Sequence, residues 1–131
     1  WRLVKSGVSL LLHSSRLMRL QLRNALKISK AEQEMIDAQK KIFTGHIELL
    51  IVGKEAQGLG IGKALVDDFI SYAIHGNENA VYVQTDILCN YGFYEHQGFE
   101  QLDSTKIALN DDDQITLFLY QYKQGENLQK L

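Results

Sequence analysis

The stretch from His46 to Ala73 reads HIELLIVGKEAQGLGIGKALVDDFISYA and decides the fold of the chain. Residues 47–52 are almost entirely Leu, Ile and Val, which is typical of a short buried strand and too short for a membrane span. Gly58, Gly60 and Gly62 follow, where glycine permits positive φ and lets the backbone approach a ligand closely. The pattern predicts a strand, a glycine-rich turn and a helix that begins in that turn.

The segment after the glycines has helical periodicity. Its charged residues lie outside an apolar stripe that consists of Ile61, Leu65, Val66, Phe69, Ile70, Tyr72 and Ala73. The first N–H groups of a helix are unpaired and its N-terminus carries the positive end of the helix dipole. The turn therefore predicts a phosphate or pyrophosphate site, with the charge of Lys63 nearby.

Two known anion-binding motifs fit this turn poorly. A P-loop has four residues between its first Gly and the Gly-Lys pair, followed by Ser or Thr. Here three residues separate Gly58 from Gly62, and Ala64 follows Lys63. A dinucleotide fingerprint is G-x-G-x-x-G, whereas this turn is G-x-G-x-G.

The turn resembles motif A of the GNAT acetyltransferase superfamily, Q/R-x-x-G-x-G/A, with Gln57, Gly60 and Gly62 at its defined positions. A second stretch, NYGFYEHQGF at residues 90–99, resembles motif B of the same superfamily at the expected distance. The resemblance covers residues 45–122 and implies an α/β fold of GNAT type, a mixed sheet flanked by helices. A strand-to-helix turn with glycines used only for packing is the alternative interpretation of motif A.

The resemblance implies an N-acetyltransferase that uses acetyl-CoA as co-substrate and a small-molecule or peptide amine as acceptor. In GNAT proteins the turn amides hold the pyrophosphate and the strand edge pairs with the pantetheine arm. The cofactor-binding residues implied here are Leu50, Ile51, Val52, Gln57, Gly58, Leu59, Gly60, Ile61, Gly62, Lys63, Asn90 and Phe93. Helix capping is an alternative role for Asn90.

The catalytic groups implied are a general acid and a general base. By resemblance, Tyr94 is the acid, and because a phenol has a pKa of about 10 it is protonated at neutral pH and able to donate. A core aromatic with a satisfied hydroxyl is the alternative. Glu48 and His46 share one face of the strand, so either could accept the amine proton, with Glu48 ranked first. Structural charge pairing is the alternative for both, and a free amine needs no dedicated base.

Composition favours one domain able to bury a core, because the 131 residues are 45% hydrophobic. Charge is uneven: residues 1–45 carry nine Lys and Arg against three acids, and residues 46–131 carry five against thirteen. We expect a basic helical N-terminal segment (1–45), an acetyl-CoA-binding core (46–122) and a tail (123–131). The resemblance also implies strands before motif A, so we expect that an N-terminal part of the sheet is missing from a chain that opens on Trp1.

Two helices are expected in the N-terminal segment. The first has an apolar stripe at Leu11, Met18, Leu22 and Ala25 and a basic stripe at Arg16, Arg19, Arg23 and Lys27. A solvated face, attraction of phosphates or an acidic acceptor, and docking on an anionic membrane are the three interpretations of the basic stripe. The second helix is predicted from an N-cap at Ser29, with Glu32 at the capping-box position, to about Ile42.

Beyond the motif A helix, a polar turn is expected at 75–79, then a strand at 80–85 parallel to the first. A short helix at 88–97 should stop at Gly98, and strands 99–109 and 114–122 should pair antiparallel through the acidic turn 110–113. Cys89 is expected to be a buried small hydrophobe rather than a catalytic thiol.

The sequence also bears on metal ions, membranes, nucleic acids and oligomers as partners. The four histidines have no metal-ligand spacing and Cys89 is the only cysteine, so no metal site is predicted. No membrane span and no nucleic-acid partner are expected, a homodimer is allowed, and a cytoplasmic location is the default. Two other functions stay open: a non-catalytic CoA-binding regulatory module, and a membrane-surface or partner-binding protein that acts through the basic helix 16–27.

Overall fold

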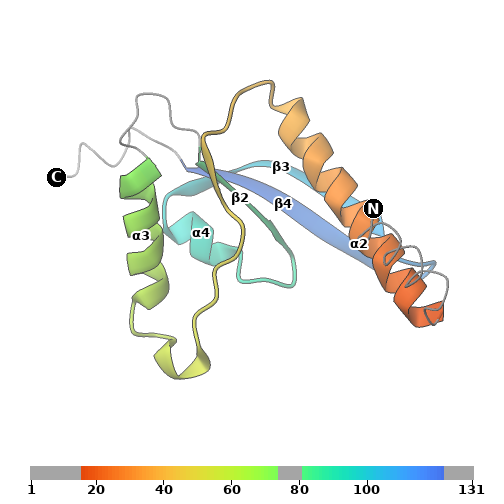
Figure 1. Ribbon diagram of the computed structural model, residues 1–131, viewed down its shortest axis with the longest axis horizontal. Coiled ribbons are helices and arrows are strands. Elements are labelled where there is room, and N and C mark those ends of the chain that lie inside the picture. Colours follow the sequence, from red (N-terminus) through yellow and green to blue (C-terminus); the bar gives the residue numbers. More distant parts are fainter. Residues whose placement is uncertain (1–15, 74–80, 123–131) are drawn as a thin grey trace, which may run out of the picture.

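A four-stranded mixed sheet organises the computed structural model, which describes residues 16–73 and 81–122 (Figure 1). The strand order is β1-β2-β4-β3, with β1 parallel to β2 and the other pairs antiparallel. The predicted α/β architecture is confirmed. In chain order the elements are α2 (Arg16–Ala38), β1 (Gly45–Ile47), the 3-10 helix η1 (Lys54–Ala56), α3 (Ile61–Ala73), β2 (Val81–Asp86), α4 (Gly92–His96), β3 (Phe99–Ala108) and β4 (Gln114–Tyr122).

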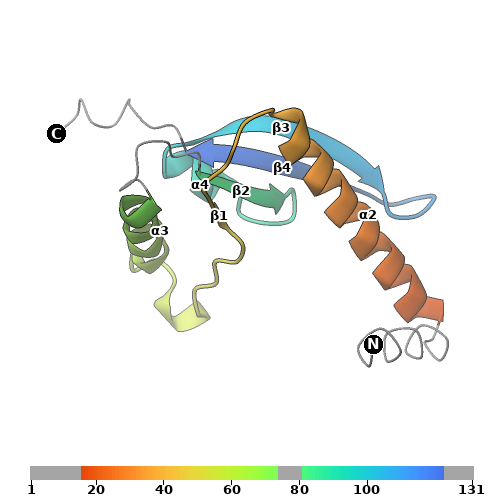
Figure 2. The same ribbon diagram turned by 45° about the horizontal axis from the view of Figure 1, so that its top comes forward.

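The sheet separates two apolar clusters, one on each face. Strand side chains alternate, so Val81 and Val83 of β2 point to one face while Tyr82 points to the other. The first face packs against α3 and α4, and its buried residues are Val66, Ile70, Val81, Val83, Phe99 and Tyr120. The second packs against α2, and its buried residues are Met35, Ile115, Leu117 and Leu119. Figure 2 shows α2 crossing the sheet on the side away from α3.

The β3–β4 hairpin forms where the sequence predicts it. Its acidic turn is held by Asn110, whose side-chain oxygen accepts the N–H groups of Asp112 (2.9 Å) and Asp113 (2.8 Å). The Leu109 N–H donates to the Asp113 carbonyl at 2.8 Å and closes the turn. An Asn side chain that caps its own turn explains why this polar run reverses the chain.

A single helix replaces the two that we expected before β1. α2 runs without a break from Arg16 to Ala38, so the prediction of an N-cap at Ser29 is wrong. The residues after Ser29 are good helix formers and the helix contains neither Gly nor Pro, so nothing interrupts it. It also ends earlier than the predicted Ile42, at a turn in which Lys40 has a φ of 51°.

The packing face of α2 also differs from the expected stripe. The residues that contact the second cluster are Ile28, Ala31, Met35 and Ile36, all in the C-terminal half of the helix. Met18, Leu22 and Ala25 are exposed instead, and Leu11 lies outside the described residues. The stripe residues Met18, Leu22 and Ala25 do not pack on the sheet because only the C-terminal half of α2 lies over it (Figure 2).

β1 is shorter than predicted and begins earlier. It pairs with β2 only through Gly45, His46 and Ile47, and residues 48–53 continue without a partner strand. Leu49 and Ile51 are therefore 75% and 73% exposed rather than buried, while Leu50 and Val52 stay half-buried. The expectation of a buried strand at 47–52 is wrong because an apolar run indicates burial but not whether a neighbouring strand is present.

The polar turn predicted at 75–79 and the tail predicted at 123–131 lie outside the described residues. None of the helices that the structure describes is long and apolar enough to cross a membrane.

Candidate functional site

The N-terminus of α3 opens into the glycine-rich turn. The first hydrogen bond into the helix runs from the Ala64 N–H to the Gly60 carbonyl at 3.0 Å. The N–H groups of Ile61, Gly62 and Lys63 thus precede the helical ladder, at the positive end of the helix dipole. This geometry suits a bound phosphate group.

Gly58 and Gly60 are needed for backbone conformation and not for packing. Their φ angles are 79° and 77°, a region that L side chains rarely adopt. A Cβ added at either position would meet nothing within 4 Å, so both face open space. The packing interpretation therefore does not account for these two glycines, and the turn keeps its backbone accessible.

Gly62 has a different role, because it joins the two sequence motifs. A Cβ at this position would lie 3.4 Å from Cζ of Phe93 and 3.5 Å from Cγ2 of Val52. The motif B ring thus lies against the backbone of the motif A helix. Val52, Gly62 and Phe93, three of the predicted cofactor-binding residues, meet at one place.

The polar side chains of motif A are occupied by neighbours. The Gln57 side-chain amide donates to the Val52 carbonyl at 3.2 Å and closes the loop between strand and turn. Lys63 pairs with Asp67 one helical turn away at 2.5 Å. Leu59 and Ile61 are exposed beside them. The backbone of the turn is therefore its main free source of hydrogen-bond donors.

A groove of about 460 Å³ lies between α3 and the segment that leaves β1. It brings together predicted base and cofactor positions with the apolar face of the helix. Its lining residues are His46, Ile47, Glu48, Leu49, Leu50, Ile51, Leu65, Val66 and Phe69.

The two candidate bases form a pair at the mouth of this groove. His46 Nε2 and Glu48 Oε2 are 2.9 Å apart, as expected for residues on one strand face. The His46 ring stacks on Tyr82 with centroids 5.2 Å apart and planes at 19°. The stacking covers one face of the imidazole, whose Nε2 lies within hydrogen-bond distance of a largely exposed carboxylate.

Two further groups interact electrostatically with Glu48, namely Glu32 and Tyr82, and Asp86 interacts with Glu32. Burial raises the pKa of Glu32, and the carboxylates of Glu48 and Asp86 raise it further. Burial also raises the pKa of Tyr82, with contributions from Glu48 and Glu32. Glu48 and Asp86 lie at the carboxyl ends of the parallel strands β1 and β2, a position that could have indicated their proximity. Glu32 comes from α2, and no sequence signal reports how a helix lies on a sheet.

Motif B forms a tight turn and the single-turn helix α4. The predicted helix at 88–97 is too long, because the Asp86 carboxylate accepts the N–H groups of Leu88 (2.8 Å) and Cys89 (3.2 Å) in a turn. Gly98 ends the motif at a φ of 91°, as predicted. Asn90 is exposed, and α4 has no side-chain cap, so helix capping does not explain Asn90.

Tyr94 is half-buried among aromatic rings. Its ring packs edge-on against Phe93 and Phe99, with centroids 5.3 Å and 5.7 Å away. Burial raises the pKa of Tyr94, and the nearby Cys89 adds to the effect. Among the described residues none hydrogen-bonds to its hydroxyl, so the group stays protonated and available.

Cys89 is exposed, so the prediction of a buried small hydrophobe is wrong. The turn capped by Asp86 lifts residues 87–90 away from the core, which apolar composition alone did not indicate.

A part-buried hydrogen bond ties α4 to the sheet. The hydroxyl of Tyr120, a fully buried residue of β4, donates to Glu95 Oε1 at 2.8 Å. Burial and this bond raise the pKa of Tyr120 to about 12. Because Glu95 follows Tyr94 in α4, the bond restricts the helix that carries the candidate acid.

Comparison with known proteins agrees with this geometry. The sequence matches the acetyltransferase (GNAT) domain family over residues 21–111, a region that contains both motifs and most of α2. A comparison with curated proteins gives no match. Since the family match covers more than half of the chain, and the mixed sheet and both motifs agree with it, the chain belongs to the GNAT acetyltransferase family.

Proposed function

We propose that the protein transfers the acetyl group of acetyl-CoA to a primary amine by direct attack, without a covalent enzyme intermediate. The observation that carries the proposal is the contact of Phe93 with Gly62. It joins a helix N-terminus with unpaired amides to the short helix that carries Tyr94. Family membership supports acyl transfer as the reaction class.

The turn fits the cofactor. The amides of residues 58–63 would bind the pyrophosphate, and open space at Gly58 and Gly60 supports a close approach to the backbone. Residues 50–52 lie beyond the end of β1 and have no partner strand, so their N–H and carbonyl groups could pair with the pantetheine arm. The Val52 carbonyl would then accept a second hydrogen bond, because it already accepts one from the Gln57 side chain. Bound acetyl-CoA would supply an activated thioester at the mouth of the groove.

The protein's own groups would handle the protons. The carboxylate of Glu48 accepts a proton from the acceptor ammonium, directly or through His46, and leaves a nucleophilic amine. The amine nitrogen forms a bond to the acetyl carbon while the carbon–sulfur bond breaks, and the nitrogen gives its second proton to water, which leaves a neutral amide and returns a proton to Tyr94 after Tyr94 has protonated the sulfur. The Tyr94 hydroxyl gives its proton to the departing sulfur, which its raised pKa permits up to alkaline pH. An unpaired amide of residues 48–52 stabilises the developing oxyanion.

Positioning makes the largest contribution. Holding two reactants in line is worth up to about 7–11 kcal/mol for ideally placed groups. The glycine turn and the groove beside α3 are two adjoining surfaces suited to that task.

The first experiment is calorimetric titration of the protein with acetyl-CoA, for the wild type and for Gly60→Glu, which places bulk and negative charge in the turn. Gly53→Glu is the matched control, because Gly53 is exposed, has no neighbour within 4 Å and precedes η1. We expect Gly60→Glu to remove binding and Gly53→Glu to retain it.

If acetyl-CoA binds, the second experiment is a screen of amines for release of the CoA thiol. Release that depends on an amine supports the transferase. Acetyl-CoA affinity without release for any amine would instead favour the non-catalytic CoA-binding module. Equal binding by Gly60→Glu and the wild type would exclude the turn as the cofactor site.

A further inference from the structure

The N-terminal half of α2 extends away from the sheet. The α2 residues in the second cluster begin at Ile28, and the side chain of Lys27 reaches the end of β3, where it donates to the Ala108 carbonyl at 3.3 Å. Figure 2 shows the end of α2 near Arg16 diverging from β3 and β4. The part of α2 from Arg16 to Leu26 thus forms a helix surface that the sheet does not cover.

This surface is unusually apolar for an exposed helix. Leu17 and Leu26 are each 64% exposed, and the other large exposed apolar residues are Met18, Leu20 and Leu22. Single exposed leucines are normal on a protein surface, but five large apolar side chains within three turns form a patch that indicates an interaction site.

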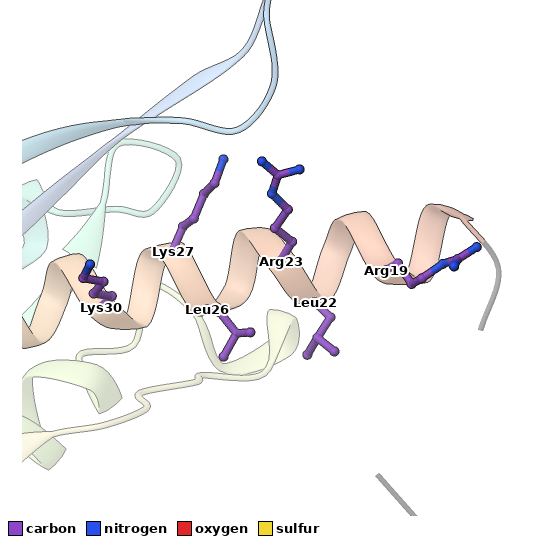
Figure 3. A pocket seen from close by; sticks show the side chains of 6 residues that line it. All are labelled: Arg19, Leu22, Arg23, Leu26, Lys27 and Lys30. Carbon is purple, nitrogen blue, oxygen red and sulfur yellow. The ribbon is translucent and has the colours of Figure 1, made fainter. Parts of the chain in front are cut away.

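The same surface is strongly basic. Arg16, Arg19 and Arg23 lie on it, Lys27 and Lys30 continue the basic stripe toward the sheet, and the first acid in α2 is Glu32. Residues 46–131 are acidic, with five Lys and Arg against thirteen Asp and Glu. In Figure 3, Leu22 and Leu26 project from one side of the helix and Arg23 and Lys27 from another, around a shallow groove of about 410 Å³. A complementary partner is therefore both anionic and apolar.

We propose that the N-terminal half of α2 docks the domain on the surface of an anionic lipid bilayer. Leucines buried at the boundary between headgroups and acyl chains allow long basic side chains to reach the phosphates, which is the usual geometry of interfacial helices. The acidic part of the chain, residues 46–131, is repelled by such a surface, so α2 determines the orientation of docking.

The arrangement of the leucines favours lipid over an acidic protein. Helical spacing places Leu17 and Leu20 on one side of α2, and Met18, Leu22 and Leu26 on another. The basic residues lie between these two sets, so leucines on either side can enter the headgroup boundary while the basic side chains reach the phosphates, whereas a groove in a folded protein accommodates one apolar stripe. In this orientation the glycine turn, on the other side of the sheet, stays in contact with water.

The test is co-sedimentation with vesicles of phosphatidylcholine containing phosphatidylserine, and with phosphatidylcholine alone. Two double variants are compared with the wild type: Arg19→Gln with Arg23→Gln, and Leu22→Gln with Leu26→Gln. Their single-site controls are Lys106→Gln, exposed on the face of β3 away from α2, and Leu88→Gln, whose side chain is 85% exposed in the loop after β2. Circular dichroism checks that each variant is folded.

We expect binding only to the anionic vesicles, weakened by salt. Each neutralised arginine should reduce the partition coefficient about fivefold, and the leucine pair should reduce it at least about tenfold. The controls should match the wild type. Equal loss in the controls, equal binding to phosphatidylcholine alone, or retention on poly-glutamate without vesicle binding would overturn the proposal, the last in favour of an acidic protein partner.

Discussion

The ring of Phe93 lies against the backbone of Gly62, where an added Cβ would be 3.4 Å from Cζ of the ring. This contact joins a helix N-terminus to the aromatic turn more than thirty residues later in the chain. Any side chain at Gly62 larger than a methyl group must displace the ring, the turn or both.

Replacement of Gly62 by valine should therefore separate the two motifs. Overpacking of this kind costs about 1–3 kcal/mol of unfolding free energy, and acetyl-CoA affinity should fall with it. Urea denaturation and calorimetry measure the two effects. Gly53→Val, at a position with no neighbour within 4 Å, should change neither affinity nor packing. The double variant Gly62→Val with Phe93→Ala should lose less stability than the sum of the single variants, and strict additivity would contradict the contact.

Tyr94→Phe tests the proposed general acid. The substitution removes a hydroxyl that bonds to no described residue, so stability and acetyl-CoA affinity should be retained. Turnover, measured as thiol release with an amine identified by screening, should fall by about 100-fold or more. Because burial raises the pKa of Tyr94, the alkaline decline of the wild-type rate should begin at a higher pH than an ordinary tyrosine would give. Tyr72→Phe, at an exposed position of α3, is the control, and an unchanged rate in Tyr94→Phe would assign proton donation elsewhere.

Tyr120 should make the fold sensitive to alkali. Its pKa is about 12 in the folded protein and about 10 in an unfolded chain, so the folded state binds the proton more tightly. The contribution of this group to stability is complete below about pH 10 and is lost as pH rises toward 12. The wild type should lose stability over that window more steeply than Tyr120→Phe, as followed by thermal unfolding. Parallel curves of stability against pH for the two proteins would show that ionisation of Tyr120 does not contribute to the loss of stability.

Ser29→Ala distinguishes one continuous α2 from two helices by the sign of its effect. In a helix interior, alanine is more favourable than serine by roughly 0.5 kcal/mol. At an N-cap the same substitution costs about 1 kcal/mol. Since Ser29 is an exposed residue inside α2, we expect a small gain in unfolding free energy, measured by urea denaturation. Ser71→Ala in α3 is the comparison, because its hydroxyl bonds the Asp67 carbonyl at 2.8 Å.

Local patterns predicted the hairpin and the turn correctly. β3, β4 and the turn at Asn110 follow from alternation and turn chemistry, which act within a few residues. The end of β1 and the packing face of α2 depend on which distant segments are present to cover them. The exposure of Cys89 has a local cause instead, the turn that the Asp86 carboxylate caps, which the sequence interpretation did not recognise.

For the candidate site, too, the sequence predicted the local features but not the contacts between distant elements. Side-chain alternation correctly brought His46 and Glu48 together, and the glycine spacing indicated a helix N-terminus with free amides. The contact of Gly62 with Phe93 and the approach of Glu32 to Glu48 require the tertiary arrangement of three elements, so no periodicity in the sequence encodes them.

Because β1 is paired over so few residues, the β1 edge of the sheet should open more easily than the β3–β4 hairpin. β1 is held by three residues against β2, whereas β3 and β4 are paired along nearly their whole length. Release of β1 therefore costs less than opening of the hairpin, and it frees the chain up to Gly60 while β3 and β4 stay paired. Amide hydrogens of 45–60 should exchange well before those of β4, and a ligand held by that segment would slow their exchange by mass action.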